Sequence, residues 1–379
     1  MKTKHLIMAM AALAIAGCSQ NEITEKSPDA NPAIGFSVYT GAQTKGAVTD
    51  NTAIQASNKG FGICAYLTGS SGYSTSGAKS LFMDNIQATY TSGTPGSWGY
   101  SPTKFWPTNT DKLSFFAYAP YSVGDGSDNG IKLVKATGTT DPLVTFALQT
   151  KQKEMVDLVV SESTNSNPNK TIDMTSSDAT VAFKLKHVLT RINMKAKTSV
   201  DISSNADTKV FITKVEFIQS NKLNSTRDFN MKTGEWASST TYLTSPYELK
   251  DAGNSTDEGI LNMAAASFGG YTTNSIDIST DAAGISLFPA DEYLFFIPID
   301  KTTGTANAGD VQLKITYDIV TKTSNTTHAK STTEKTIDLG TGAFKQGTAY
   351  LYTITVGLND IKVSGTVEDW GTATPGNLS

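Results

Sequence analysis

The residues with the clearest chemical potential lie at the start of the chain, where small side chains come just before a cysteine. Lys2 and Lys4 precede an apolar stretch from Leu6 to Ala16, and Gly17 then leads into Cys18. Small residues here give a peptidase access to the peptide bond, and the thiol of Cys18 is a nucleophile that can take up a lipid chain. Because the apolar stretch is too short to cross a bilayer with ease, it predicts a cleaved export signal.

The segment Ile15-Ala16-Gly17-Cys18 resembles the lipobox of bacterial lipoproteins, in which the cysteine is acylated and becomes the new N-terminus. The resemblance implies a signal peptide over residues 1–17 and an acyl (palmitate-type) anchor on Cys18, in the outer membrane and exposed at the surface. One acyl chain at ~0.8 kcal/mol per buried methylene holds a protein only marginally, whereas several hold it firmly. The alternative is an ordinary secretory signal with an incidental cysteine.

The chain carries no constellation that predicts an enzyme. Of its three histidines, His5 lies in the expected signal peptide, and His187 and His328 are far apart in the sequence. A metal site or a nucleophile–base pair needs several such residues at close spacing, and no phosphate loop or nucleophile elbow occurs. His187 lies in an alternating apolar pattern, which favours a structural role. We expect no enzyme, metal or cofactor, although a glycosidase carboxylate pair assembled by the fold is an alternative.

The second cysteine and the overall charge also limit the possible functions. Cys64 lies within the apolar run from Phe61 to Leu67, without a base or cation close in sequence, so we expect a buried side chain rather than a reactive thiol. If Cys18 is acylated, no disulfide within the chain can form. The formal net charge is -4. Such a chain lacks the basic excess that binding to nucleic acid requires.

Aromatic residues are densest in one short segment, where Trp98, Tyr100, Phe105 and Trp106 occur close together. If these rings are exposed, they could stack on sugars. If they are buried, they fill the core beside the apolar run 113–120. We favour burial, because large aromatic side chains contribute most when they are removed from water.

The elements that must position these residues have the pattern of β-strands. Ile34, Phe36 and Val38 occupy every second position, as in a strand with one buried face. Further strands are expected at 61–67, 113–119, 144–148, 155–160, 181–189, 210–218, 293–299, 311–320, 350–356 and 361–367. Residues 80–87 could form a short helix. Many short strands between turn formers predict an all-β fold of antiparallel sandwiches.

At 379 residues the chain is long enough for about two domains. Residues 18–32 are polar and include two prolines, which predicts a flexible tether. Residues 161–178 are rich in Ser, Asn and Thr, with only Ile172 and Met174 as sizeable apolar residues, and we interpret them as a linker. The predicted domains are therefore an N-terminal β-sandwich over 33–165 and a C-terminal β-sandwich over 179–379.

Several segments together resemble the fimbrillin superfamily of Bacteroidota, which includes stalk, tip and anchor subunits of type V pili. The matching residues are Trp98, Tyr100, Lys104 to Pro107, Ala117 to Pro120, Asp157 to Val160, Phe183 to Leu189, Phe295 to Pro298, Gly347 to Tyr350 and Ile361 to Trp370. These matches cover nearly the whole mature chain. The resemblance implies two tandem transthyretin-like β-sandwich domains and a role as a pilus subunit or adhesin of the cell surface.

The resemblance also implies assembly by strand exchange. In stalk subunits a trypsin-like protease removes the first strand, usually after Arg, and a strand from the next subunit fills the groove. The counterpart here is the strand from Ile34 to Thr40, with the cut between Lys45 and Gly46, so lysine replaces the usual arginine. The implied partners are other pilus subunits, the outer membrane and a host or bacterial surface ligand.

Two alternatives stay open from the sequence. The segment from Ile361 to Trp370 is either a mobile donor strand or a permanent part of the second domain, and the permanent form would suit a tip, an anchor or a free lipoprotein. The alternative to a pilus subunit is a surface lipoprotein that never polymerises and binds a glycan or another ligand.

Overall fold

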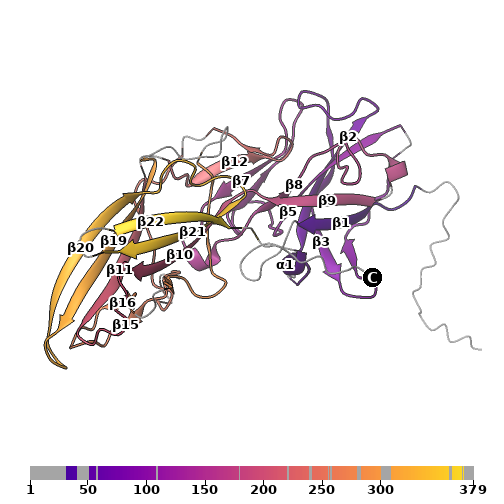
Figure 1. The fold of residues 1–379 in the computed structure, drawn as a ribbon. Helices are drawn as coiled ribbons and strands as arrows, with labels where there is room; N and C mark the ends of the chain where they lie inside the picture. Colours follow the sequence, from indigo (N-terminus) through magenta and orange to yellow (C-terminus); the bar gives the residue numbers. More distant parts are fainter. Residues whose placement is uncertain are drawn as a thin grey trace, which may run out of the picture.

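The computed structural model describes residues 31–40, 51–56, 59–107, 110–178, 180–219, 222–238, 241–254, 256, 258–279, 283–299, 309–357, 361–368 and 370. Within these residues strands dominate, and the helical elements are α1 (Asn51–Ala56) and two 3₁₀ turns, Gln152–Glu154 and Ser176–Asp178. The all-β prediction is confirmed. Figure 1 shows an elongated molecule, with the earlier strands at one end and the later strands at the other. Among the described residues no helix is long and apolar enough to span a membrane.

Seven strands form the first sheet, in the order β1-β9-β8-β5-β2-β3-β4. Their bounds are β1 (Gly35–Thr40), β2 (Phe61–Gly69), β3 (Ser80–Thr91), β4 (Ser97–Tyr100), β5 (Lys112–Ala119), β8 (Val159–Ser161) and β9 (Thr180–His187). The central strands β2 and β5 are apolar on both faces, because both faces of the sheet are covered. Cys64 and Phe116 face one core, whereas Phe61 and Phe115 face the other.

A four-stranded sheet covers one face of this first sheet. Its order is β13-β12-β7-β6, with β6 (Ile131–Val134), β7 (Leu143–Ala147), β12 (Thr226–Asn230) and β13 (Glu235–Trp236). β7 pairs antiparallel with β12, so this sheet combines strands from both sides of the expected linker (Figure 1). The indole Nε1 of Trp236 donates a hydrogen bond to the carbonyl of Val188 at 2.9 Å, which ties β13 to the crossing between β9 and the next strand.

Two further sheets hold the later strands. One has the order β17-β10-β21-β22, with β18 also paired to β10; its strands are β10 (Thr190–Thr198), β17 (Ile285–Ser286), β18 (Leu294–Phe296), β21 (Thr348–Val356) and β22 (Ile361–Glu368). The other has the order β15-β16-β11-β19-β20, with β14 paired to β11; its strands are β11 (Thr208–Gln219), β14 (Tyr247–Glu248), β15 (Ala264–Ala265), β16 (Asn274–Asp277), β19 (Val311–Lys322) and β20 (His328–Asp338). Phe217 of β11 meets Phe296 of β18 at 5.2 Å between ring centroids, so the two sheets share one core.

Two local predictions are wrong. Residues 80–87, expected as a short helix, form the first part of β3. The strand that was expected to open the second domain, β9, instead pairs with β8 and β1 in the first sheet. Apolar side chains of β9, such as Phe183, belong to the same core as side chains of strands from the first half of the chain.

The expected linker also packs onto the first sheet. Its two apolar side chains, Ile172 and Met174, are 5% and 2% exposed. Leu113 of β5 exchanges backbone hydrogen bonds with Met174 at 2.9 and 2.8 Å. A few apolar residues and backbone pairing are therefore enough to order a segment of mostly polar composition. The division into two tandem transthyretin-like domains stays a prediction.

Candidate functional site

The first strand is the outermost strand of the seven-stranded sheet, and it runs parallel to β9. The pairing extends from Gly35 opposite Thr180 to Thr40 opposite Leu185. The predicted alternation is confirmed, because Ile34 and Phe36 are 2% and 6% exposed, and Val38 packs partly buried against the same core. A strand at this position can leave without breaking the pairing of any other strand.

Phe36 fills a groove that aromatic rings from three other strands form. Its ring lies 5.0 Å from that of Tyr100, 5.9 Å from Phe115 and 5.8 Å from Phe183, measured between centroids. The contacts with Tyr100 and Phe115 are edge-to-face and that with Phe183 is stacked, which are favourable arrangements for aromatic pairs. Removal of β1 would therefore open an aromatic groove.

Hydrogen bonds hold both ends of this strand. At its start, the amide of Ile34 donates to the carbonyl of Lys104 at 2.9 Å, and the hydroxyl of Tyr100 donates to the carbonyl of Ile34 at 2.9 Å. At its end, the amide of Thr40 donates to Oδ1 of Asn51 at 2.8 Å, at the start of α1. Burial raises the pKa of the Tyr100 hydroxyl, so it stays protonated and can donate this bond at neutral pH.

The aromatic segment that we considered for sugar stacking belongs mainly to the core of the first sheet. Trp106 is 1% exposed and its ring lies 5.8 Å from that of Phe115. Trp98 packs edge-on against Phe61 at 4.8 Å. The preference for burial is confirmed for Trp106, whereas Phe105 is 56% exposed.

The predicted modification sites lie outside the described residues: Cys18, Lys45 and Gly46 are among the residues whose structure is not described. Cys64 is described and is 5% exposed, as expected for a core side chain. Burial raises the pKa of its thiol from 9.0 to about 11, so it is not a nucleophile at neutral pH.

Both described histidines have local hydrogen-bond partners and do not form a joint centre. Nδ1 of His187 lies 2.8 Å from Oδ2 of the buried Asp157, and Nδ1 of His328 lies 2.8 Å from the carbonyl of Gly269. These partners fix the orientation of each ring, which agrees with a structural role. In the described parts of the chain, no group of three or more His, Cys, Asp or Glu side chains is placed to hold a metal ion.

Sequence reasoning missed an aromatic clamp at the end of the chain. The ring of Trp370 stacks on that of His187 at 4.0 Å, with an angle of 9° between the planes. Its Nε1 donates to the carbonyl of Gly347 at 2.6 Å, and the guanidinium of Arg191 lies 5.1 Å from the indole ring. A tryptophan just beyond a terminal strand was the available signal, but nothing in the sequence identified its partners. This clamp attaches the end of β22 to the junction between β9 and β10.

Comparison with known proteins identifies relatives of this chain. The model of the fimbrillin-like family matches residues 44–370. The chain is 39% identical over 387 residues to the fimbrium subunit Fim1C of Phocaeicola vulgatus, covering 97% of this chain and 96% of the relative. It is also similar to the crystal structure of a fimbrial protein from Bacteroides vulgatus, with 35% identity, a TM-score of 0.76, and coverage of 90% of this chain and 100% of that one. The chain belongs to the fimbrillin-like family, a family of fimbrial proteins rather than of enzymes.

Proposed function

We propose that the chain is a lipid-anchored pilus subunit or adhesin that assembles by donor-strand exchange after a protease removes its first strand. Family membership and the relative named as a fimbrium subunit support a place in a surface fimbrium, together with other pilus subunits. The acylated residue is Cys18, and the anchor places the chain on the outer membrane before assembly. The cut falls between Lys45 and Gly46.

The observation that carries the proposal is the position of β1. It is the outermost strand of its sheet, and its inward side chains Ile34, Phe36 and Val38 fill a groove between other strands. Loss of the strand would undo the burial of Ile34 and Phe36, worth roughly 1.5–3 kcal/mol for each of these two side chains, with a smaller contribution from the partly buried Val38. It would also leave the free edge of β9 without its backbone partners, a ready template for another strand.

A donated strand would reverse both effects. Backbone hydrogen bonds along β9 would supply affinity, and alternate apolar side chains that fit the positions of Ile34, Phe36 and Val38 would supply specificity. The donor must therefore have large side chains at every second position, with the bulkiest at the position of Phe36. A truncated subunit is an unstable acceptor until such a strand arrives, and this difference drives assembly.

Mass spectrometry of the N-terminus tests the proposal, applied to cell-associated protein and to purified filaments. We expect acylated Cys18 in the cell-associated form and a terminus at Gly46 in filaments. Lys45→Ala should keep the uncut terminus and reduce filaments, whereas Lys45→Arg should be cut normally. Lys59→Ala is the matched control, because Lys59 is exposed but lies beyond the first strand. Filaments made of chains that still start at Cys18 would refute the processing step.

A further inference from the structure

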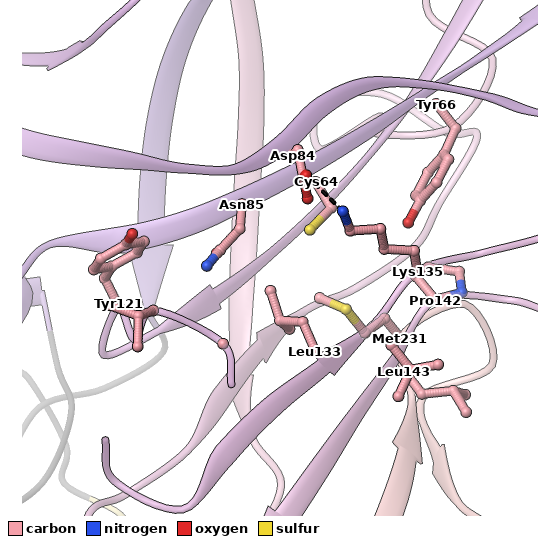
Figure 2. Close-up of a pocket in the computed structure, with 13 residues that line it drawn as sticks. Cys64, Tyr66, Asp84, Asn85, Tyr121, Leu133, Lys135, Pro142, Leu143 and Met231 are labelled. Atoms are coloured by element: carbon pink, nitrogen blue, oxygen red, sulfur yellow. Dashed lines mark hydrogen bonds and ion pairs between the residues drawn. The ribbon is translucent and has the colours of Figure 1, made fainter. Parts of the chain in front are cut away.

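A cavity of about 320 Å³ opens between the first sheet and the four-stranded sheet, away from the groove of β1. Figure 2 shows Cys64, Asp84 and Asn85 on one side of it and Leu133, Leu143 and Met231 on the facing side. Cavities of this size and mixed character are typical of small-molecule sites. The strand exchange proposed above does not use it.

A β-bulge turns two polar residues toward this cavity. In the ladder between β2 and β3, Ile63 pairs with Ile86 and Ala65 pairs with Met83, so two residues of β3 lie opposite the single residue Cys64. These two residues are Asp84 and Asn85, and both line the cavity, although consecutive side chains of a regular strand point to opposite faces. Bulges commonly re-aim side chains beside functional sites.

The backbone conformation and the side-chain hydrogen bonds of Asn85 fix the geometry of the bulge. Its φ is +47°, in the left-handed region that residues other than glycine seldom adopt. Its Nδ2 donates to the carbonyl of Ser122 at 2.9 Å, and its Oδ1 accepts from the hydroxyl of Tyr118 at 2.9 Å. Asn85 thus fixes the loop that follows β5 along one wall of the cavity.

An ion pair crosses the mouth of the cavity. Nζ of Lys135, just after β6, lies 2.6 Å from Oδ2 of Asp84, and the two side chains are 58% and 52% exposed. The pair therefore presents a hydrogen-bond acceptor and a donor side by side with no net charge.

Most of the remaining lining residues are apolar, and some of them are open to solvent. Val123 and Val134 line the cavity and are 59% and 37% exposed, so they leave apolar surface in water. Leu143 lies opposite the exposed Val134 in the β6–β7 ladder, whereas Leu133 packs against the core. The ring of Tyr121 lies at one end of the cavity (Figure 2). A ligand that covered these side chains would gain from their removal from water.

We propose that this cavity binds a neutral saccharide unit. A sugar ring has vicinal hydroxyl groups, which can accept from Lys135 and donate to Asp84 at the same time. Its C–H face can contact the apolar side chains that line the cavity, among them Leu133, Leu143 and the exposed valines. Because the charges of Asp84 and Lys135 balance, the pair gives no net electrostatic attraction to an anionic or a cationic ligand. The subunit would thereby carry an adhesive site that stays accessible whether or not its first strand is exchanged.

A glycan array tests this, probed with full-length protein purified in detergent, followed by titration calorimetry with the neutral saccharide that binds best. We expect Asp84→Asn and Lys135→Met each to weaken binding by about tenfold, the loss expected when a hydrogen bond to a charged group is removed. Val134→Trp should block the cavity and abolish binding.

Two variants serve as controls. Lys59→Met removes another exposed ion pair, which Lys59 makes with Asp128 at 3.0 Å, and Val200→Trp adds the same ring at a valine that is 62% exposed and outside the cavity. Both should bind as the original chain does, and circular dichroism should show the same melting for all variants. Three results would each overturn the proposal: no neutral saccharide bound on the array, preference for anionic glycans, or binding that survives Val134→Trp.

Discussion

The contacts of Phe36 in the groove of β1 let us predict how much this side chain contributes to the free energy of strand binding. Phe36 is 6% exposed and touches three aromatic rings, and it supplies the largest inward side chain of β1. Replacement of a buried Phe by Ala costs about 3–5 kcal/mol. Because β1 lies at the edge of the sheet, where the groove can relax, we take the lower end of this range. Phe36→Ala should therefore weaken the attachment of β1 by about 3 kcal/mol.

Peptide complementation measures this loss directly. A chain that begins at Gly46 is mixed with a synthetic peptide of residues 31–40, and the dissociation constant is determined by calorimetry. A loss of about 3 kcal/mol corresponds to roughly a 150-fold weaker peptide. Tyr39→Ala is the matched control, because Tyr39 points outward and is 56% exposed, and its change should be within about 0.5 kcal/mol. Equal affinities for the original and Phe36→Ala peptides would refute the argument that this groove drives strand exchange.

Three other outcomes follow from the structure. Trp370→Ala should lower the free energy of unfolding, measured by urea denaturation, by about 2 kcal/mol, because it removes the stack on His187 and the contact with Arg191. The control Val367→Ala changes a residue that is 70% exposed and should leave this free energy unchanged. Cys64 should resist iodoacetamide at pH 8.5 until the chain is denatured, because its buried thiol has a pKa of about 11; fast alkylation of the folded chain would contradict its burial. Since this raised pKa keeps the folded thiol neutral, its contribution to stability should be complete below pH 9 and should fall as the pH rises from 9 to 11, which urea titrations at each pH measure.

The first strand was predictable because its signal is local. Ile34, Phe36 and Val38 alternate, and such a period of two is visible in a single sequence. Its neighbour was not predictable, because the parallel pairing with β9 joins segments from opposite sides of the expected linker. Composition placed β9 with the strands that follow it, whereas packing placed it with the core that β1, β2 and β5 build. The sequence pattern within a strand does not indicate which distant strand will pair with it.

The wrong helix prediction and the missed cavity have one cause. Met83 and Ile86 both pack against the core of the first sheet, yet they are three residues apart, a spacing that resembles one face of a helix. The extra residue of the bulge at Asp84 and Asn85 produces this spacing. Alternation fails where a bulge re-aims side chains, so the irregularity that obscured the strand also marks the proposed saccharide site.

The C-terminal strand fits its own sheet better than it would fit the groove of β1. Gly365 lies opposite Tyr352 of β21, and a Cβ at that position would come within 3.0 Å of the Tyr352 ring. The same glycine would leave a large gap wherever a donor strand must replace a ring such as that of Phe36. The clamp of Trp370 adds to the energy needed to detach β22. Both features favour a permanent C-terminal strand, which would suit a tip, an anchor or a free lipoprotein. If the subunit does polymerise, the strand that fills the groove of β1 must then come from another chain with bulkier residues at alternate positions.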